Sequence, residues 1–158
     1  MPPSGTIAIF VDADACPVKD EIYVVATRYG LPVAVVANSR MFVPEDLGAQ
    51  LIVVEEGPDV ADDWIAENVQ AGDVVVTADV PLAARCLEKG AAVVGSNGRP
   101  FTEDSIGSAL ATRDLKAQLR EGGVITGGPP PLSERDRSRF SSVLDGLVHR
   151  SLRNTEGH

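Results

Sequence analysis

The sequence predicts an α/β fold in which three layers, α/β/α, contain a mainly parallel five-stranded sheet. Five short runs rich in Val, Ile and Ala alternate with segments of helical periodicity, as in chains that build parallel sheets from strand–helix–strand units. Hydrophobic residues make up 44% of the 158 residues and aromatic residues only 4%, so the core must be largely aliphatic. This length predicts a single domain, 1–158.

The first strand is predicted at residues 7–11, an uninterrupted apolar run that stops at Asp12. Pro17 suits the first turn of a helix, which is predicted over 17–29 and ends at Gly30. The remaining strands are predicted at 32–37, 51–54, 74–77 and 91–94. Further helices are predicted at 59–69, 81–89, 102–120 and 133–152, with a flexible Gly- and Pro-rich loop at about 122–132.

Composition narrows the classes of function. The formal net charge of −9 argues against a broad basic face for duplex nucleic acid, although a local basic groove remains compatible with it. The two cysteines have no short paired spacing, which argues against a disulfide framework or a zinc site. No signal peptide and no apolar run of membrane-spanning length are present, so we expect a cytoplasmic protein without a membrane partner.

Aspartates recur where the predicted strands end and one helix begins. Asp12 ends the first strand and Asp14 follows it, Asp79 follows the fourth strand, and Asp62 and Asp63 open the preceding helix. If these places converge, the carboxylates form a site suited to Mg²⁺ or Mn²⁺. The structural alternatives are that Asp14 caps a helix and that Asp62 and Asp63 complement a helix dipole. Spacing alone does not choose between Asp62 and Asp63.

Several strings resemble one protein family. They are Asp12-Ala-Asp-Ala-Cys-Pro-Val-Lys19, Gly57-Pro-Asp59 with Asp62-Asp-Trp-Ile65, Gly72-Asp-Val-Val-Val-Thr-Ala-Asp79-Val-Pro-Leu-Ala, Gly98-Arg99 and Arg135-Asp-Arg-Ser-Arg-Phe140. On these strings the chain is identified as a member of the YaiI/YqxD family, also called UPF0178 or DUF188. The resemblance covers about residues 7–150.

The resemblance implies a fold similar to the PIN-like group of metal-dependent nucleases. In that group one Asp ends the first strand, an acidic residue lies on a central helix, and another Asp follows a Thr-x-Asp strand end. Asp12, Asp62 or Asp63, and Asp79 match these places, whereas Asn97 stands where a further acidic residue is expected. The implied activity is phosphodiester hydrolysis on RNA. Asp12 and Asp79 would hold the metal, and Asp62 or Asp63 would complete the site or act on the water. Asp14 would be an alternative or indirect ligand.

Basic residues shortly after predicted strands are candidates to contact phosphates: Lys19, Arg40, Arg85 and Arg99. The alternative is that they balance a strongly acidic chain. The start of the last helix carries three further arginines, at 135, 137 and 139, which suit a solvated face or an interface with a partner chain, including a homo-oligomer. Trp64, Tyr23 and Tyr29 are expected in the core or on helix surfaces, so no aromatic platform for bases is predicted.

Parts of the sequence also suggest three other functions. An aspartyl-phosphate phosphatase of the haloacid-dehalogenase type would use Asp12 as nucleophile and Asp14 as acid, but Asp62 and Asp63 open a helix where that superfamily places other groups. A non-catalytic module would bind RNA or protein through the last helix. Cys16 is interpreted as a small packed residue rather than a nucleophile, because nearby carboxylates oppose a thiolate.

Overall fold

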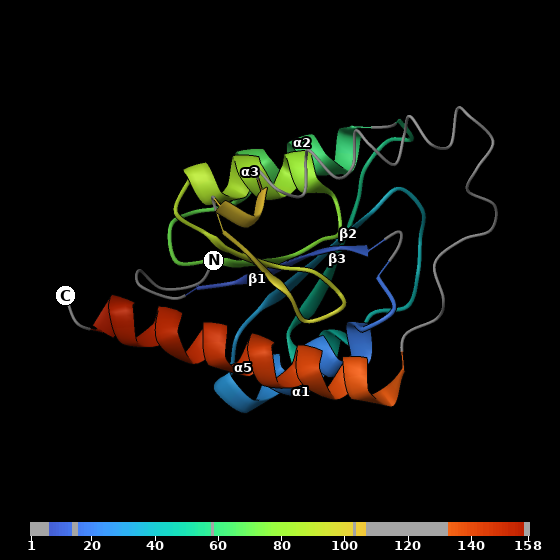
Figure 1. The fold of residues 1–158 in the computed structure, drawn as a ribbon. Coiled ribbons are helices and arrows are strands. Elements are labelled where there is room, and N and C mark those ends of the chain that lie inside the picture. The colour runs from blue at the N-terminus through green and yellow to red at the C-terminus, as the bar shows by residue number, and fades with distance from the viewer. Residues whose placement is uncertain (1–6, 14–15, 58, 103, 107–132, 157–158) are drawn as a thin grey trace.

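The protein is built around a six-stranded sheet with helices on both faces (Figure 1). The computed structural model describes residues 7–13, 16–57, 59–102, 104–106 and 133–156. The spatial order of the strands is β3-β2-β1-β4-β5-β6. The strands are β1 (Ile9–Asp12), β2 (Val33–Ala37), β3 (Ala49–Val53), β4 (Val74–Val76), β5 (Ala92–Val94) and β6 (Pro100–Phe101).

The five predicted strands are present and pair in parallel, but the predicted number of strands was too low. The additional strand, β6, pairs antiparallel with β5 at the edge of the sheet. The sequence analysis predicted no strand there, because two residues are too few to show a periodicity. Pro100 is compatible with an edge strand, where its missing N–H leaves no ladder position unfilled.

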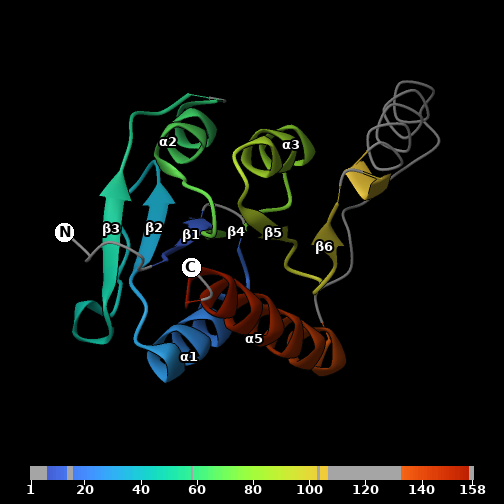
Figure 2. The same ribbon diagram turned by 90° about the vertical axis from the view of Figure 1, so that its left-hand side faces the viewer.

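Helices form a layer on each face of the sheet, as Figure 2 shows end-on. On one face, α1 (Lys19–Tyr29) and α5 (Glu134–Glu156) pack on an aliphatic cluster that includes Ile9 and Val11. On the other face, α2 (Val60–Asn68) and α3 (Val80–Glu88) pack on a second cluster that includes Phe10. A short 3₁₀ turn, η2 (Glu45–Leu47), precedes β3. The three-layer prediction is therefore confirmed.

The last helix docks on the domain itself. Ser133 caps α5 reciprocally, since its Oγ accepts from the Asp136 N–H at 3.1 Å while its own N–H donates to Asp136 Oδ2 at 3.2 Å. Phe140, Leu144 and Val148 are fully buried against α1 and the sheet. The predicted helix at 102–120, beyond its described first turn, and the predicted loop at 122–132 lie outside the described residues.

The strand order reverses direction between β1 and β4. From β1 the chain builds outward through β2 and β3, and then returns to place β4 on the other side of β1. In open parallel sheets the crevice at such a reversal, outside the carboxyl ends of the strands, is the usual place for a ligand. The described part of the chain has no helix that is long and apolar enough to cross a membrane.

Candidate functional site

The carboxyl ends of β1 and β4 are joined by a side-chain hydrogen bond. Parallel pairing sets Val11 opposite Val76, so the next residues in each strand, Asp12 and Thr77, emerge side by side. The Thr77 hydroxyl donates to Asp12 Oδ2 at 2.9 Å, and Thr77 is buried. This hydrogen bond orients the half-buried carboxylate of Asp12 at the point where the strand order reverses.

Asp79 is held beside this pair by two backbone contacts. Its N–H donates to Thr77 Oγ1 at 3.0 Å, and its Oδ1 accepts from the Leu82 N–H at 2.8 Å. Asp79 is thus the N-cap of α3, where Pro81 occupies the first turn. A capping role and a place at the carboxyl edge of the sheet are combined in one residue.

Asp62 is the residue of the acidic pair that faces the strand ends. Its pKa is raised from 3.8 to about 6, mainly by burial and in part by the charges of Asp79 and then Asp12, which places the three carboxylates within electrostatic reach of one another. The three predicted places therefore converge on one edge. Asp59 adds to the same field; it occupies the N-cap position of α2, but its side chain makes no capping hydrogen bond.

Asp63 turns away from this edge. It is exposed, and its Oδ1 pairs with Arg85 on α3 at 2.7 Å. Helical spacing carries the signal that separates the two residues: Asp62 stands four positions before the buried Ala66, and Asp63 four positions before the exposed Glu67. The periodicity of this helix could therefore have distinguished Asp62 from Asp63, although the spacing to the strands did not.

Among the residues that the structure describes, no group of three or more His, Cys, Asp or Glu side chains is arranged to hold a metal ion. Asp14, the predicted alternative ligand, lies outside the described residues. Mg²⁺ commonly binds through one or two carboxylates and retains several waters, so Asp12 and Asp79 fit such an ion without a third protein ligand.

The motifs that surround this edge match a family model. The model described as "Uncharacterized BCR, YaiI/YqxD family" (DUF188) matches residues 10–150. The chain belongs to the YaiI/YqxD family.

Similar full-length relatives support the assignment. A UPF0178 protein (amb2838) of Paramagnetospirillum magneticum is 57% identical over 145 residues, covering 92% of this chain and 96% of the relative. A UPF0178 protein of Azorhizobium caulinodans is 58% identical over 147 residues, covering 93% and 92%. One of Rhodopseudomonas palustris is 56% identical over 153 residues, covering 97% and 93%. No solved structure gives a significant match.

The basic residues of this YaiI/YqxD chain are placed unequally. Arg40 and Arg99 are exposed on the loops that follow β2 and β5, at the same edge as the aspartates. Arg85 is engaged by Asp63. The ammonium of Lys19 donates to the carbonyls of Cys16 at 3.0 Å and Ala13 at 3.3 Å, which places it over the turn between β1 and α1.

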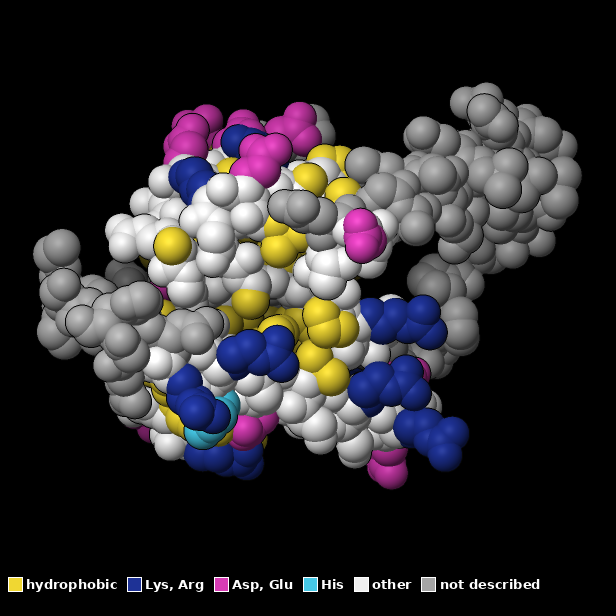
Figure 3. Space-filling view, turned by 60° about the vertical axis from the view of Figure 1, so that its left-hand side comes forward, with side chains coloured by type: hydrophobic (Ala, Val, Ile, Leu, Met, Phe, Trp, Pro, Cys, Tyr) yellow, Lys and Arg dark blue, Asp and Glu magenta, His cyan; other side chains and the backbone are white. Residues whose placement is uncertain are grey.

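The arginines of α5 serve a different part of the YaiI/YqxD fold. Arg137 donates to the Pro17 carbonyl at 2.8 Å and pairs with Glu21 at 3.2 Å, so it fastens α5 to the start of α1. On the face drawn in Figure 3, basic side chains gather on the α1 and α5 side and acidic ones on the α2 and α3 side. The prediction of an interface with a partner chain stays untested.

Cys16 and Phe42 complete the surroundings of the site. Cys16 is buried, and burial raises the pKa of its thiol, while Lys19 and a hydrogen bond from Ser96 oppose that shift. The raised pKa favours the interpretation of Cys16 as a packed residue.

Sequence reasoning missed Phe42, which lies in the loop before β3 with 89% of its surface exposed. Its signal was a lone aromatic residue in a loop without periodicity, two positions after Arg40.

Proposed function

We propose that the acidic edge binds Mg²⁺ or Mn²⁺ and that the protein is a metal-dependent phosphodiesterase acting on RNA. One observation carries the proposal: Asp12, Asp62 and Asp79 come from three separate elements and lie at the same edge of the sheet, where the strand order reverses, within electrostatic reach of one another. Like charges are gathered at a cost, and a cation offsets that cost.

Each carboxylate has a distinct part in this proposal. Asp12, oriented by Thr77, and Asp79, oriented by the start of α3, would hold the ion. Bound Mg²⁺ or Mn²⁺ supplies Lewis-acid stabilisation of a phosphate oxygen and acidifies water. Asp62 would accept a proton from the attacking water, because it belongs to a neighbouring helix and, among the residues that the structure describes, makes no ion pair of the kind that Asp63 makes.

The charge pattern favours a single-stranded nucleic acid as the substrate. The strand-end loops contribute Lys19, Arg40 and Arg99 near the acidic edge, which suits contacts to a few phosphates. The net charge of −9 gives no extended basic face of the kind that holds a duplex. A single strand, which presents one backbone to a narrow basic margin, fits this distribution.

The test is a calorimetric titration of Mn²⁺ into chelator-treated protein. The parent is expected to bind saturably, and Asp12→Asn and Asp79→Asn are expected to lose at least tenfold in affinity. Both amides keep the hydrogen-bonding oxygens, and Asn is also a good N-cap, so the charge is removed while the fold is retained. Asp63→Asn is the matched control and should bind as the parent does, because Asp63 pairs with Arg85 away from the edge.

The same variants separate this proposal from its rivals. Cleavage of a single-stranded RNA with Mn²⁺, lost in Asp12→Asn and kept in Asp63→Asn, supports the phosphodiesterase. Manganese binding that is indifferent to Asp12 overturns it. A phosphoenzyme trapped on Asp12 supports the phosphatase instead. RNA binding by the Asp12→Asn, Asp79→Asn double variant, with no cleavage by the parent, supports a binding module.

A further inference from the structure

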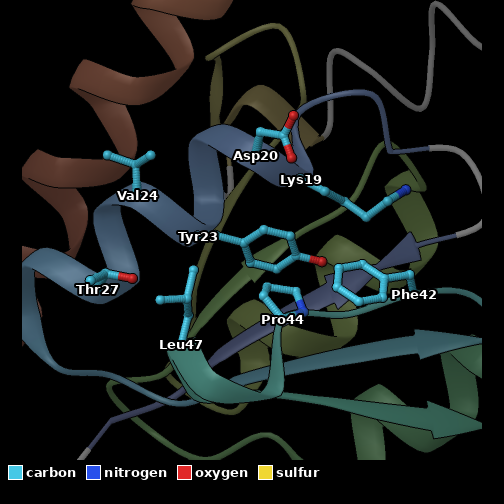
Figure 4. Close-up of a pocket in the computed structure, with 8 residues that line it drawn as sticks. All are labelled: Lys19, Asp20, Tyr23, Val24, Thr27, Phe42, Pro44 and Leu47. Carbon is cyan, nitrogen blue, oxygen red and sulfur yellow. The ribbon is translucent and has the colours of Figure 1, made fainter.

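A groove of about 600 Å³ lies between α1 and the loop that precedes β3 (Figure 4). Its walls are mainly apolar and include Tyr23 and Val24 from α1 and Phe42, Pro44 and Leu47 from the loop. In Figure 4 the Tyr23 ring points toward Phe42 and Pro44, and Lys19 extends on the same side as Phe42. The volume falls within the ~300–1,000 Å³ that is usual for sites of small organic groups.

The groove gathers most of the large hydrophobic side chains that the described residues expose to water. Within the described ranges, four large hydrophobic side chains are exposed, and three of them line this groove: Phe42 at 89%, Val24 at 58% and Leu47 at 43%. The fourth, Val53 at 51%, lies on β3 outside it. Scattered exposed apolar residues need no explanation, whereas a contiguous set around a groove marks a binding surface.

The groove is continuous with the acidic edge. Lys19 forms part of its wall, and the same ammonium binds the Ala13 and Cys16 carbonyls in the turn that follows Asp12. The charge of Asp12 reaches the Cys16 thiol and that of Cys16 reaches the Tyr23 hydroxyl, raising the pKa of each, although burial is the main cause of both shifts. Lys19 is therefore the residue that links the groove to the acidic edge.

We propose that this groove binds an unpaired nucleobase of a single-stranded RNA whose phosphate contacts Lys19. The inference rests on the proposed function and deepens it by assigning the place of a neighbouring nucleotide. Aromatic side chains stack on any base, and Phe42 and Tyr23 supply two such rings. Lys19 has three N–H donors and, within the described part of the chain, uses two on carbonyls, which leaves one for a phosphate oxygen.

The charges at the rim favour this occupant over an apolar peptide. Lys19 and Asp20 stand together on the wall, one suited to a phosphate and the other able to accept from an exocyclic amine of a base. Arg40 is exposed two positions before Phe42 and adds a second cation to the same loop. A nucleobase matches these features, because it is flat and apolar, carries polar groups on its edge and is joined to a phosphate.

The experiment measures binding of a short single-stranded RNA that carries one 2-aminopurine, with EDTA present so that no cleavage occurs. Phe42→Ala is expected to weaken binding roughly 5- to 150-fold and to abolish the fluorescence quenching that stacking produces. Phe42→Trp should restore both. Val53→Ala, which shortens an exposed hydrophobic residue outside the groove, is the matched control and should bind as the parent does.

The outcomes separate this inference from the proposed function. If RNA binding depends on Phe42 but the parent shows no manganese binding that depends on Asp12, the nucleobase site is supported and the phosphodiesterase proposal is contradicted. Manganese binding through Asp12 with no RNA binding by the parent, or with binding indifferent to Phe42, would overturn the nucleobase site alone. Sedimentation that shows a dimer dissociating in Phe42→Ala, at unchanged RNA affinity, would assign the groove to a second copy and overturn the inference.

Discussion

The hydroxyl of Thr77 donates to Asp12 Oδ2 at 2.9 Å, and this one bond ties the carboxyl end of β4 to that of β1. The Thr77 hydroxyl oxygen in turn accepts from the Asp79 N–H at 3.0 Å. Thr77 therefore orients the Asp12 carboxylate directly and positions the backbone of Asp79. Thr77 is buried and does not itself reach the surface where a ligand would bind. It is a positioning residue for both aspartates.

Replacing Thr77 with Val should separate position from chemistry. Val keeps the shape but leaves the Asp79 N–H without its acceptor, so we expect a loss of about 1–3 kcal/mol in the free energy of unfolding. Loss of a supporting hydrogen bond should also weaken Mn²⁺ binding roughly 10- to 100-fold. Urea denaturation and calorimetry measure the two effects. Thr77→Ser keeps the hydroxyl and should retain most of both; equal losses in the Ser and Val variants would contradict the role of the hydroxyl.

The raised pKa of Asp62 predicts how stability depends on pH. In the unfolded chain this carboxyl ionises near 3.8, whereas in the folded protein it holds its proton until about pH 6. The folded state therefore binds more protons between these values, and the free energy of unfolding falls as pH rises through this window. Asp62→Asn should remove that fall and, after allowance for solvent screening, stabilise the metal-free protein at pH 7.5 by up to about 1 kcal/mol.

Thermal unfolding in EDTA at pH 4.5 and 7.5 measures this effect. The melting temperature of Asp62→Asn should exceed that of the parent by up to about 2–4 °C at pH 7.5, and the gap should shrink at pH 4.5. Asp63→Asn is the control, because it breaks only the exposed pair with Arg85. A gap that is the same at both pH values would show that Asp62 does not carry the shifted proton.

The elements that sequence periodicity predicted well are those with uninterrupted apolar runs. β1 and β4 were expected near their observed positions, and Asp12 and Asp79 followed because parallel strands share one carboxyl edge. What periodicity did not reveal depends on contacts between distant residues. The pairing of Pro100–Phe101 with β5 is too short for a pattern, and the groove between Phe42 and α1 exists only once a loop packs against a helix.

A buried carboxylate at the opposite end of the sheet also makes a testable contribution. Asp73 accepts from the Ala8 N–H at 2.9 Å and from the Gln70 N–H at 2.8 Å, which ties the start of β4 to that of β1. Asp73→Ala leaves both donors without this acceptor and should cost about 2–4 kcal/mol, measured by urea denaturation. Gln70→Ala keeps the backbone donor and should change stability by less than about 0.5 kcal/mol. An equally small loss of stability in Asp73→Ala would contradict a stabilising role for the two hydrogen bonds that Asp73 accepts.

The docking of α5 depends on a glycine in the turn between β5 and β6. Gly98 has φ of +81°, and a Cβ added there would lie 2.9 Å from the Phe140 N and 3.0 Å from Arg139 Cγ. Gly98→Ala therefore combines backbone strain with a clash against α5 and should destabilise the protein by about 2–4 kcal/mol. Differential scanning calorimetry measures this cost.

The matched control lies within α5 itself. Gly146 is a helical glycine with nothing within 4 Å of an added Cβ, so Gly146→Ala should stabilise the protein by about 0.5–1 kcal/mol. The two substitutions add the same methyl group and are expected to act in opposite directions, since only one of them meets the backbone of Phe140. If Gly98→Ala were as well tolerated as Gly146→Ala, the turn between β5 and β6 would not be what holds this end of α5 in place.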